Sequence, residues 1–244
     1  MRRFGLIGKT LTHSFSQTYF SKKFEQEGIT DCLYQNFELP QIQDIDALLD
    51  QYPDLKGFNI TIPYKEEILP YLFQLNEVVQ AIGACNCVKV IDGKFYGFNT
   101  DVIGFRNSLQ TQLKPHHTKA LILGWGGAAK AVAYTLTFLG IDYLVVSRKN
   151  TEGTIAYTDV NQELLEQHTL IVNTTPLGMY PNVDAAPQMP YQLLTDKHFL
   201  FDLIYNPTQT QFLQLGAQQG AQTANGYEML VGQAEESWRI WNEI

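Results

Sequence analysis

The sequence is poor in several features that would narrow its function. Its three cysteines, Cys32, Cys85 and Cys87, have no second cysteine pair or histidine cluster beside them to complete a zinc site, and free thiols suit a reducing compartment. No apolar run reaches the roughly 18 residues of a membrane span, and the start, MRRFGLIG, lacks the apolar core of a signal peptide. A net charge of −8 leaves no basic excess for binding nucleic acid. We therefore expect a cytoplasmic protein without metal, nucleic-acid or membrane partners.

What the chain does have is a globular composition and a regular alternation of helix and strand signals. Its 244 residues, 45% hydrophobic and 17% charged, suit one large domain or two modest ones. An Asp92-Gly93 turn between two alternating segments predicts a β-hairpin. The polar segment KPHHTK (114–119) indicates a domain boundary. Together these patterns predict an α/β fold.

A glycine loop follows one of the apolar strands. The segment LILGWGGAAKA (121–131) places Gly124, Gly126 and Ala129 in the pattern G-x-G-x-x-A, between a strand and a helix. The glycines permit a tight turn and a close approach to a pyrophosphate, and the N–H groups at the helix start attract phosphate. A glycine turn in an ordinary α/β unit is the plainer alternative. The strand-loop-helix-strand context favours a dinucleotide site.

The end of the next strand favours NADP(H) over NAD(H). A site for NAD has Asp or Glu there to bind the ribose hydroxyls. This chain reads VVSRKN (145–150), so Arg148 and Lys149 stand where an acid would repel a 2′-phosphate, and a guanidinium can grip that phosphate. A solvated basic pair is the alternative, which the position of the pair makes less favoured.

Polar side chains also gather where other strands end or begin. The segments are GKTLTHSFS (8–16), NITIPYK (59–65), GACN (83–86) and GFNTD (97–101). Amides and hydroxyls suit a polyhydroxylated ligand, and open α/β sheets bind ligands at strand ends. A pair formed by Lys65 and Asp101 beside a carbinol could move a proton while a nicotinamide moves a hydride. Taken singly, Asp101 could be a helix cap and Lys65 a solvated lysine.

In these motifs the chain resembles the shikimate dehydrogenase family. The resemblance runs from Phe4 nearly to the end and includes VNTTPLGM (172–179), DLIYNPT (202–208) and GYEMLVGQA (226–234). It implies two α/β domains: a discontinuous substrate domain with a mixed sheet (1–104 and 227–244) and a Rossmann-like NADP-binding domain (105–226), with the active site in the cleft. It also implies the reversible, NADPH-dependent reduction of 3-dehydroshikimate to shikimate, a step of aromatic amino-acid and chorismate biosynthesis. Monomer and homodimer stay open.

The resemblance also implies roles for particular residues. Lys65 and Asp101 would be the catalytic pair, with Lys65 as the proton donor or the electrostatic stabiliser of the developing alkoxide. The residues expected to contact the substrate are Ser14, Ser16, Asn59, Thr61, Asn86, Tyr205 and Gln233. Those expected at the cofactor are Gly124, Trp125, Gly126, Gly127, Ala128, Ser147, Arg148, Lys149, Thr174, Thr175, Met179, Gly226 and Met229. VNTTPLGMYPN is the candidate mobile loop.

The largest departure from the family pattern is a deletion after Val146. A parallel crossover needs about a dozen residues, and the family has a helix where this chain has none. We therefore expect Ile155–Asp159 to be an antiparallel edge strand or an irregular edge segment, leaving the adenine end of the cofactor open. Smaller departures are Ser147 for an asparagine and Trp125 for a small residue.

Three rival functions remain at this point. A broader quinate/shikimate dehydrogenase would share the fold and chemistry, and Ser14, Ser16 and Tyr205 would line the pocket that discriminates the two substrates. A non-catalytic paralogue that senses NADP(H) is disfavoured by the intact Lys65 and Asp101. A purely structural α/β partner domain leaves the polar strand ends unexplained.

Overall fold

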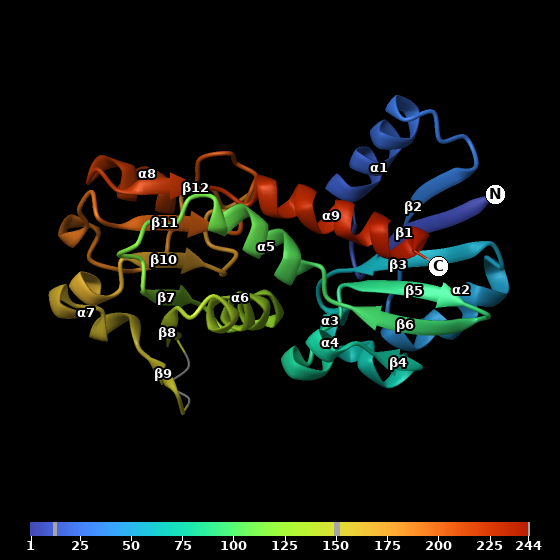
Figure 1. The fold of residues 1–244 in the computed structure, drawn as a ribbon, viewed down its shortest axis with the longest axis horizontal. Helices are drawn as coiled ribbons and strands as arrows, with labels where there is room; N and C mark the ends of the chain where they lie inside the picture. Colours follow the sequence, from blue (N-terminus) through green and yellow to red (C-terminus); the bar gives the residue numbers. More distant parts are fainter. Residues whose placement is uncertain (12–13, 149–151, 244) are drawn as a thin grey trace. The chain divides into compact units, whose positions relative to one another are not determined.

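The computed structural model describes residues 1–11, 14–148 and 152–243, and the chain divides into two compact units (Figure 1). Unit 1 comprises Met1–Thr100 and Ala234–Ile244, and unit 2 comprises Asp101–Gln233. Each has one six-stranded sheet, which confirms the predicted α/β class. The assignment of substrate and NADP binding to separate domains stays a prediction. None of the described helices is long and apolar enough to cross a membrane.

The sheet of unit 1 is mixed, with the strand order β2-β1-β3-β5-β6-β4. Its strands are β1 (Arg2–Gly8), β2 (Cys32–Glu38), β3 (Leu55–Ile60), β4 (Gln74–Leu75), β5 (Cys87–Ile91) and β6 (Lys94–Phe98). The helices of unit 1 are α1 (Phe15–Gln26), α2 (Ile45–Gln51), α3 (Tyr64–Glu67) and α4 (Glu77–Ile82), with 3₁₀ turns at Ile42–Asp44 and Leu69–Tyr71. The predicted hairpin joins β5 to β6, and its turn residues Asp92 and Gly93 have φ of 50° and 72°.

The pairing directions in this sheet bring several chain segments to one edge. β1 pairs in parallel with β3, whereas β5 runs antiparallel to both β3 and β6. Because β5 is reversed, its first residue lies at the same edge as the last residues of β1, β3 and β6. The polar segments that follow Gly8, Ile60 and Phe98, and the one that precedes Cys87, therefore meet along this edge.

The sheet of unit 2 is entirely parallel, with the order β12-β11-β10-β7-β8-β9. This is the strand order of a doubly wound dinucleotide-binding fold, in which β7 and β10 flank the point where the winding reverses. Its strands are β7 (Lys119–Leu123), β8 (Asp142–Val146), β9 (Thr154–Ile155), β10 (Leu170–Asn173), β11 (Phe199–Asp202) and β12 (Gln222–Ala224). Its helices are α5 (Asp101–Gln110), α6 (Gly127–Phe138), α7 (Gln162–Gln167) and α8 (Gln211–Gln218), with 3₁₀ turns at Tyr157–Asp159 and Tyr191–Leu193.

The core of unit 2 lies on both faces of its sheet. In β7, Ala120 and Ile122 pack with one cluster and Leu121 and Leu123 with another, and all four side chains are fully buried. Burial on both faces is what a parallel sheet between helices requires. The fold thus explains why β7 is apolar after its first residue, Lys119.

The last helix, α9 (Tyr227–Asn242), begins in unit 2 and ends in unit 1. Within unit 1 its Trp241 stacks on Phe4 with 4.9 Å between ring centroids, and its indole N–H donates to the Val88 carbonyl at 2.9 Å. Gly57 of β3 makes this possible, because a Cβ there would lie 2.3 Å from the indole. The C-terminal half of α9 is therefore a core element of unit 1.

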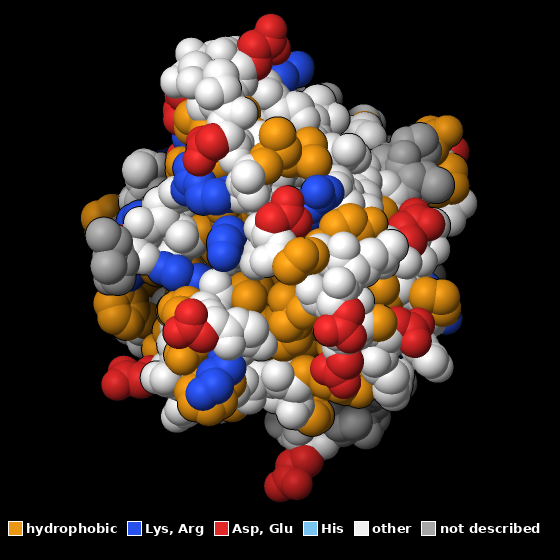
Figure 2. Space-filling view, turned by 90° about the vertical axis from the view of Figure 1, so that its right-hand side faces the viewer, with side chains coloured by type: hydrophobic (Ala, Val, Ile, Leu, Met, Phe, Trp, Pro, Cys, Tyr) orange, Lys and Arg blue, Asp and Glu red, His pale blue; other side chains and the backbone are white. Residues whose placement is uncertain are grey.

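Charged side chains at the start of β1 are paired with opposite charges. Arg2 contacts Asp31 at 2.8 Å and Arg3 contacts Asp54 at 2.9 Å. On the face shown in Figure 2, acidic, basic and hydrophobic side chains are interspersed. Exposed ion pairs such as Arg2–Asp31 contribute little to stability, so packing rather than surface charge holds this sheet together.

The deletion after Val146 is accommodated differently from the antiparallel expectation. β9 pairs in parallel with β8, Val145 opposite Thr154 and Val146 opposite Ile155, so an antiparallel strand is wrong. The paired segment is only two residues long. A parallel β9 therefore requires the chain to return only about 7 Å, from the end of β8 to the level of Val145. The dozen-residue minimum applies to strands of full length. The residues after β9 form the 3₁₀ turn Tyr157–Asp159, in keeping with the irregular alternative.

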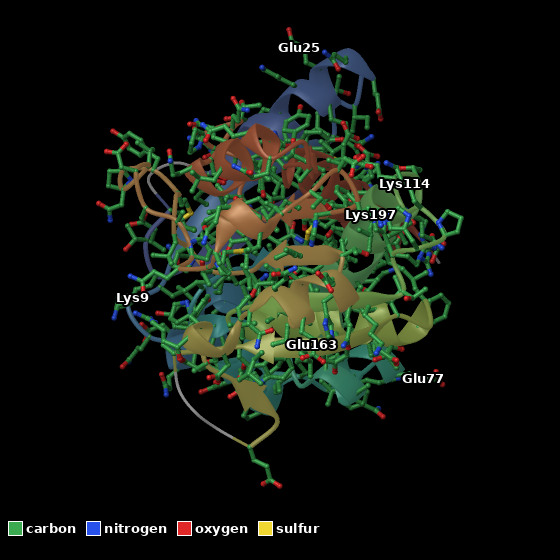
Figure 3. All side chains as sticks on the ribbon, turned by 90° about the vertical axis from the view of Figure 1, so that its left-hand side faces the viewer. Lys9, Glu25, Glu77, Lys114, Glu163 and Lys197 are labelled. Atoms are coloured by element: carbon green, nitrogen blue, oxygen red, sulfur yellow. The ribbon has the colours of Figure 1, made fainter. Side chains whose placement is uncertain are left out.

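The polar segment 114–119 is not a domain boundary, because it lies inside unit 2, whose first residue is Asp101. Its His117 is buried and holds the loop in place. Nδ1 accepts the Lys114 N–H at 3.0 Å, and Nε2 lies 3.3 Å from the Lys197 carbonyl oxygen. Figure 3 labels both lysines. Burial lowers the pKa of His117, so the neutral ring is the form that this loop requires.

Candidate functional site

A connected set of buried polar side chains lies at the edge of the unit 1 sheet. Asn59, the next-to-last residue of β3, is 3% exposed. Its Nδ2 donates to the Asn86 carbonyl at 3.2 Å and to Ser237 Oγ at 2.8 Å, and its Oδ1 accepts from the Tyr34 hydroxyl at 3.0 Å. Both amide donors of Asn59 are thus used inside the protein. These bonds anchor the end of β3, and the expected contact of Asn59 with substrate stays a prediction.

Asn86 and Thr100 continue this set. The Asn86 Oδ1 accepts the Thr100 N–H at 2.6 Å, and its Nδ2 donates to Thr100 Oγ1 at 3.1 Å. Thr100 Oγ1 also lies 3.2 Å from Ser237 Oγ. Asn86 therefore fixes the backbone of the residue that directly precedes Asp101. Asp101 itself is the first residue of α5 and is buried.

The segment 83–86 joins the ends of β3 and β6 and also reaches α3. The Cys85 N–H donates to the Lys65 carbonyl at 2.8 Å, and Asn99 Nδ2 donates to the Ala84 carbonyl at 2.9 Å. The Lys65 side chain is half-buried. Its backbone is consequently held by the same segment that carries Asn86. The structure brings together, within unit 1, the predicted residues Asn59, Asn86 and Lys65.

The other predicted residues of unit 1 lie at the same edge. Ser14 is the N-cap of α1, and its hydroxyl accepts the Gln17 N–H at 3.3 Å. Ser16, in the first turn of α1, is buried. Thr61 follows β3, and its N–H donates to the Ile7 carbonyl at 2.9 Å. Thr61 therefore continues the strand that carries Asn59, whereas Ser14 and Ser16 lie at the start of α1.

The glycine loop of unit 2 has the geometry that phosphate binding requires. Gly124 has φ of +95°, and a Cβ there would lie 2.7 Å from Thr175 Cγ2. Gly126 is the N-cap of α6, and no heavy atom lies within 4 Å of the place where its Cβ would stand. The first glycine thus permits the turn, and the second leaves open space beside the N-terminus of a twelve-residue helix that begins with Gly127 and Ala128.

The loop after β10 is fixed against this glycine loop. The Thr174 hydroxyl donates to the Leu123 carbonyl at 2.8 Å. The Thr175 N–H and hydroxyl both donate to Asn173 Oδ1, at 3.0 and 2.7 Å. Asn173 Nδ2 in turn donates to Asp202 Oδ1 at 3.0 Å. The predicted cofactor residues Thr174 and Thr175 are therefore held at the same end of the sheet as Gly124.

Asp202 is a buried carboxylate that the sequence interpretation did not single out. It also accepts the Ile204 N–H at 3.0 Å and the Thr210 hydroxyl at 2.5 Å, so it ties the ends of β10 and β11 to the start of α8. Burial raises its pKa to about 6, against which its three hydrogen bonds act. The sequence feature that could have marked Asp202 is an acidic residue at the end of an otherwise apolar strand.

The predicted 2′-phosphate residues follow β8. The Ser147 N–H donates to the Ile155 carbonyl at 2.9 Å, and Arg148 is exposed. Arg148 is near enough to Tyr157 to lower the pKa of that phenol, although burial raises it more. Lys149 lies outside the described residues. An exposed guanidinium therefore stands at the strand end where the ribose of a dinucleotide would come.

The remaining predicted residues of unit 2 divide into exposed and buried ones. Trp125 and Met179 are 46% and 47% exposed. Met229 is 7% exposed and packs in the core beside Phe105, so most of its side chain is not available to a ligand. Tyr205 is half-buried, and burial raises its pKa.

Two predicted residues near the start of α9 have steric roles in unit 2. A Cβ on Gly226 would lie 2.1 Å from the Leu203 carbonyl oxygen, so only glycine fits there. Gln233 is buried, and its Nε2 donates to the Leu230 carbonyl at 3.1 Å. Its backbone N would lie 2.9 Å from a Cβ on Gly104, so α5 and α9 cross closely.

Tyr34 and Ser237 are functional candidates that the sequence interpretation missed. They lie 25 and 178 residues from Asn59 in the chain. Tyr34 sits in a strand that reads as ordinary core, and Ser237 lies between the stripe residues of the last helix. No local pattern marks either one, so only the fold could reveal them.

Known proteins match this chain, one family model over part of unit 1 and full-length relatives over both units. The model of the shikimate dehydrogenase substrate binding domain matches residues 6–88. The shikimate dehydrogenase (NADP(+)) of Caldicellulosiruptor saccharolyticus is 36% identical over 261 residues, covering 100% of this chain and 93% of the relative.

Solved structures also match this chain over its whole length. Shikimate 5-dehydrogenase from Thermus thermophilus, in complex with NADP(H) and shikimate, matches with a TM-score of 0.88 and 30% identity, covering 100% of this chain and 94% of that one. Quinate dehydrogenase from Corynebacterium glutamicum, in complex with NAD, matches with a TM-score of 0.87 and 26% identity, covering 100% and 94%. The chain is thus a two-unit α/β protein with one mixed sheet and one parallel sheet of the dinucleotide-binding type. The chain belongs to the shikimate dehydrogenase family.

Proposed function

We propose that this protein catalyses the reversible, NADPH-dependent reduction of 3-dehydroshikimate to shikimate. The observation that carries the proposal is the meeting of Lys65, Asn86 and the residue before Asp101 at one sheet edge in a chain that also holds a G-x-G-x-x-A loop at a parallel sheet edge. The full-length similarity to NADP-dependent shikimate dehydrogenases supports the same reaction. Unit 1 would bind the substrate and unit 2 the nucleotide.

The residues of unit 2 fit NADP(H). The open space beside Gly126 and the N-terminal end of α6 suit a pyrophosphate, and Arg148 suits a 2′-phosphate. Thr174 and Thr175 would border the same nucleotide, and Trp125, Met179, Gly226 and Tyr205 would surround its nicotinamide half and the substrate. When bound, NADPH supplies the hydride.

Lys65 and Asp101 would act on the carbonyl that is reduced. The Lys65 ammonium would stabilise the negative charge that develops on the carbonyl oxygen and would return a proton to it. Asp101 would keep this ammonium oriented. Ser14, Ser16, Thr61, Asn86 and Gln233 would hold the carboxylate and ring hydroxyls, with Asn59 acting from behind them. The proposal requires that substrate and nicotinamide meet during turnover.

The experiment that tests the proposal follows nicotinamide absorbance with purified protein. Shikimate and quinate are each combined with NADP and with NAD, and Lys65→Ala and Asp101→Asn are assayed beside the wild type. We expect strong NADP reduction with shikimate and a loss of about 10²-fold or more in kcat for both variants. Circular dichroism of each variant controls for folding.

The outcomes separate the rival functions. Comparable turnover with quinate or NAD would replace the proposal with a broader quinate/shikimate dehydrogenase, a relative of which matches this chain with NAD bound. Tight NADPH binding without turnover on either substrate would leave a nucleotide sensor and remove the catalytic roles of Lys65 and Asp101.

A further inference from the structure

We infer that Ser237, on the C-terminal half of α9, is a positioning residue for the substrate site and acts on it through Asn59 and Thr100. Tyr34 is a second positioning residue and acts on the same site through Asn59. This inference rests on the proposed function, because it concerns the site that would bind shikimate. Neither side chain was marked by the sequence patterns. Both are buried, Ser237 at 0% and Tyr34 at 2% exposure, so neither would touch a ligand directly.

Ser237 joins two strand ends that carry candidate substrate residues. Its Oγ accepts from Asn59 Nδ2 at 2.8 Å and lies 3.2 Å from Thr100 Oγ1. Asn59 is the next-to-last residue of β3, which leads to Thr61 and Lys65, whereas Thr100 follows β6 and leads to Asp101. The Ser237 hydroxyl of α9 thus sets the distance between the end of β3, before Lys65, and Thr100, before Asp101.

Tyr34 fixes the orientation of the same amide from the opposite side. Its hydroxyl donates to Asn59 Oδ1 at 3.0 Å. Reversing the amide would turn Oδ1 toward the Asn86 carbonyl oxygen, now 3.2 Å from Nδ2, and would set two acceptors against each other. The network therefore permits a single orientation of Asn59.

Removing either hydroxyl leaves a buried Asn59 atom without its partner. Loss of Ser237 Oγ leaves a buried donor unsatisfied, and loss of the Tyr34 hydroxyl leaves a buried acceptor unsatisfied. Either is costly, so the amide or its neighbours would shift to find another partner. Such a shift would move the Thr61–Lys65 segment or the Thr100–Asp101 segment, and small displacements of reacting groups reduce rates strongly. The effect should fall on the substrate and not on the nucleotide, since Ser237, Tyr34, Asn59 and Thr100 all belong to unit 1.

The test compares Ser237→Ala and Tyr34→Phe with the matched control Ser108→Ala. Ser108 is also a buried helical serine, but its hydroxyl donates to the Phe105 carbonyl of its own helix at 2.9 Å. We expect kcat/KM for shikimate to fall about tenfold in Ser237→Ala and in Tyr34→Phe, a loss typical of one buried hydrogen bond. KM for NADP should change less than about twofold in both. Ser108→Ala should keep wild-type kinetics.

Two further measurements keep the inference open to refutation. Shikimate affinity by calorimetry gives a readout that needs no turnover, and it should weaken in parallel with kcat/KM. The double variant should lose less than the product of the single losses, because both hydroxyls act through Asn59. Wild-type shikimate kinetics in the folded Tyr34→Phe or Ser237→Ala protein would overturn the inference. A wild-type protein that neither binds nor oxidises shikimate would instead overturn the proposed function.

Discussion

The sharpest prediction concerns two glycines that stand two residues apart in the loop after β7. Gly124→Ala should destabilise the fold, whereas Gly126→Ala should leave the fold nearly intact and impair NADPH binding. The two substitutions are chemically identical and differ only in their surroundings. The comparison therefore separates the structural function of this loop from its function in binding.

The structure gives the expected size of each effect. At Gly124 a side chain meets φ of +95°, which costs about 1–2 kcal/mol, and a Cβ 2.7 Å from Thr175 Cγ2. Overpacking of that kind adds about 1–3 kcal/mol, so the total is about 2–5 kcal/mol. At Gly126 φ is −128° and the space around the Cβ position is open. Only the poorer N-cap remains, at about 0.5–1 kcal/mol.

The assay pairs urea unfolding of each variant with NADPH titration. For Gly126→Ala we expect a small shift of the unfolding midpoint and an increase of about tenfold or more in the Kd for NADPH, since the new methyl group occupies the approach to the helix N-terminus. Gly140→Ala is a poor control because its φ is +69°. Thr137→Ala, an exposed position at the far end of α6, serves better as the control for the helix itself.

Two results would refute this reasoning. Unchanged NADPH affinity in Gly126→Ala would mean that the open space beside α6 does not receive the pyrophosphate. A Gly124→Ala protein as stable as the wild type would mean that the contact with Thr175 does not constrain this loop.

Three further predictions concern specificity, pH and packing. Arg148→Ala should lower kcat/KM with NADP about 10–100-fold and leave NAD nearly unchanged; equal losses with both would exclude a 2′-phosphate contact. Because the pKa of His117 is lowered in the fold, the unfolded chain takes up its proton first as pH falls below about 6.5, so stability should decline from there toward lower pH. His117→Gln should show a shallower decline in its urea midpoint between pH 7.5 and 5.5, and an equal decline would contradict this cause. Trp241→Leu should lower the free energy of unfolding by about 2–4 kcal/mol through loss of its packing on Phe4, whereas Trp125→Leu, at an exposed position, should change it little.

The sequence was sufficient for the architecture where local signals were strong. The Asp92-Gly93 turn, the glycine loop after β7 and the apolar stripe of α9 each specify their element through backbone conformation or periodicity, and each was found as predicted. The family motifs likewise identified the residues that the edge of the unit 1 sheet brings together. Periodicity and turn chemistry act over a few residues, so they can be recognised in the sequence without knowledge of the fold.

Predictions that depended on distant partners were less accurate. The bonds that join Tyr34 and Ser237 to Asn59 come from distant segments, so no pattern around Asn59 predicted them, and its contact with substrate stays a prediction. β9 looked too close to β8 for parallel pairing because the length of a strand cannot be read from the loop before it. Segment 114–119 looked like a linker because its anchoring contact, Lys197, lies far along the chain.

The route of α9 has a consequence for the order in which the protein can be made. Unit 2 is one continuous stretch, whereas unit 1 contains Trp241, whose indole packs directly against Gly57 of β3. A ribosome adding about 5–20 residues per second needs on the order of ten seconds to synthesise unit 2 after Thr100 has been made. Throughout that interval the aromatic face of the first hundred residues is uncovered. The first part of the chain to be synthesised is therefore the last to acquire its complete core, and it is the part that a chaperone would have most reason to bind.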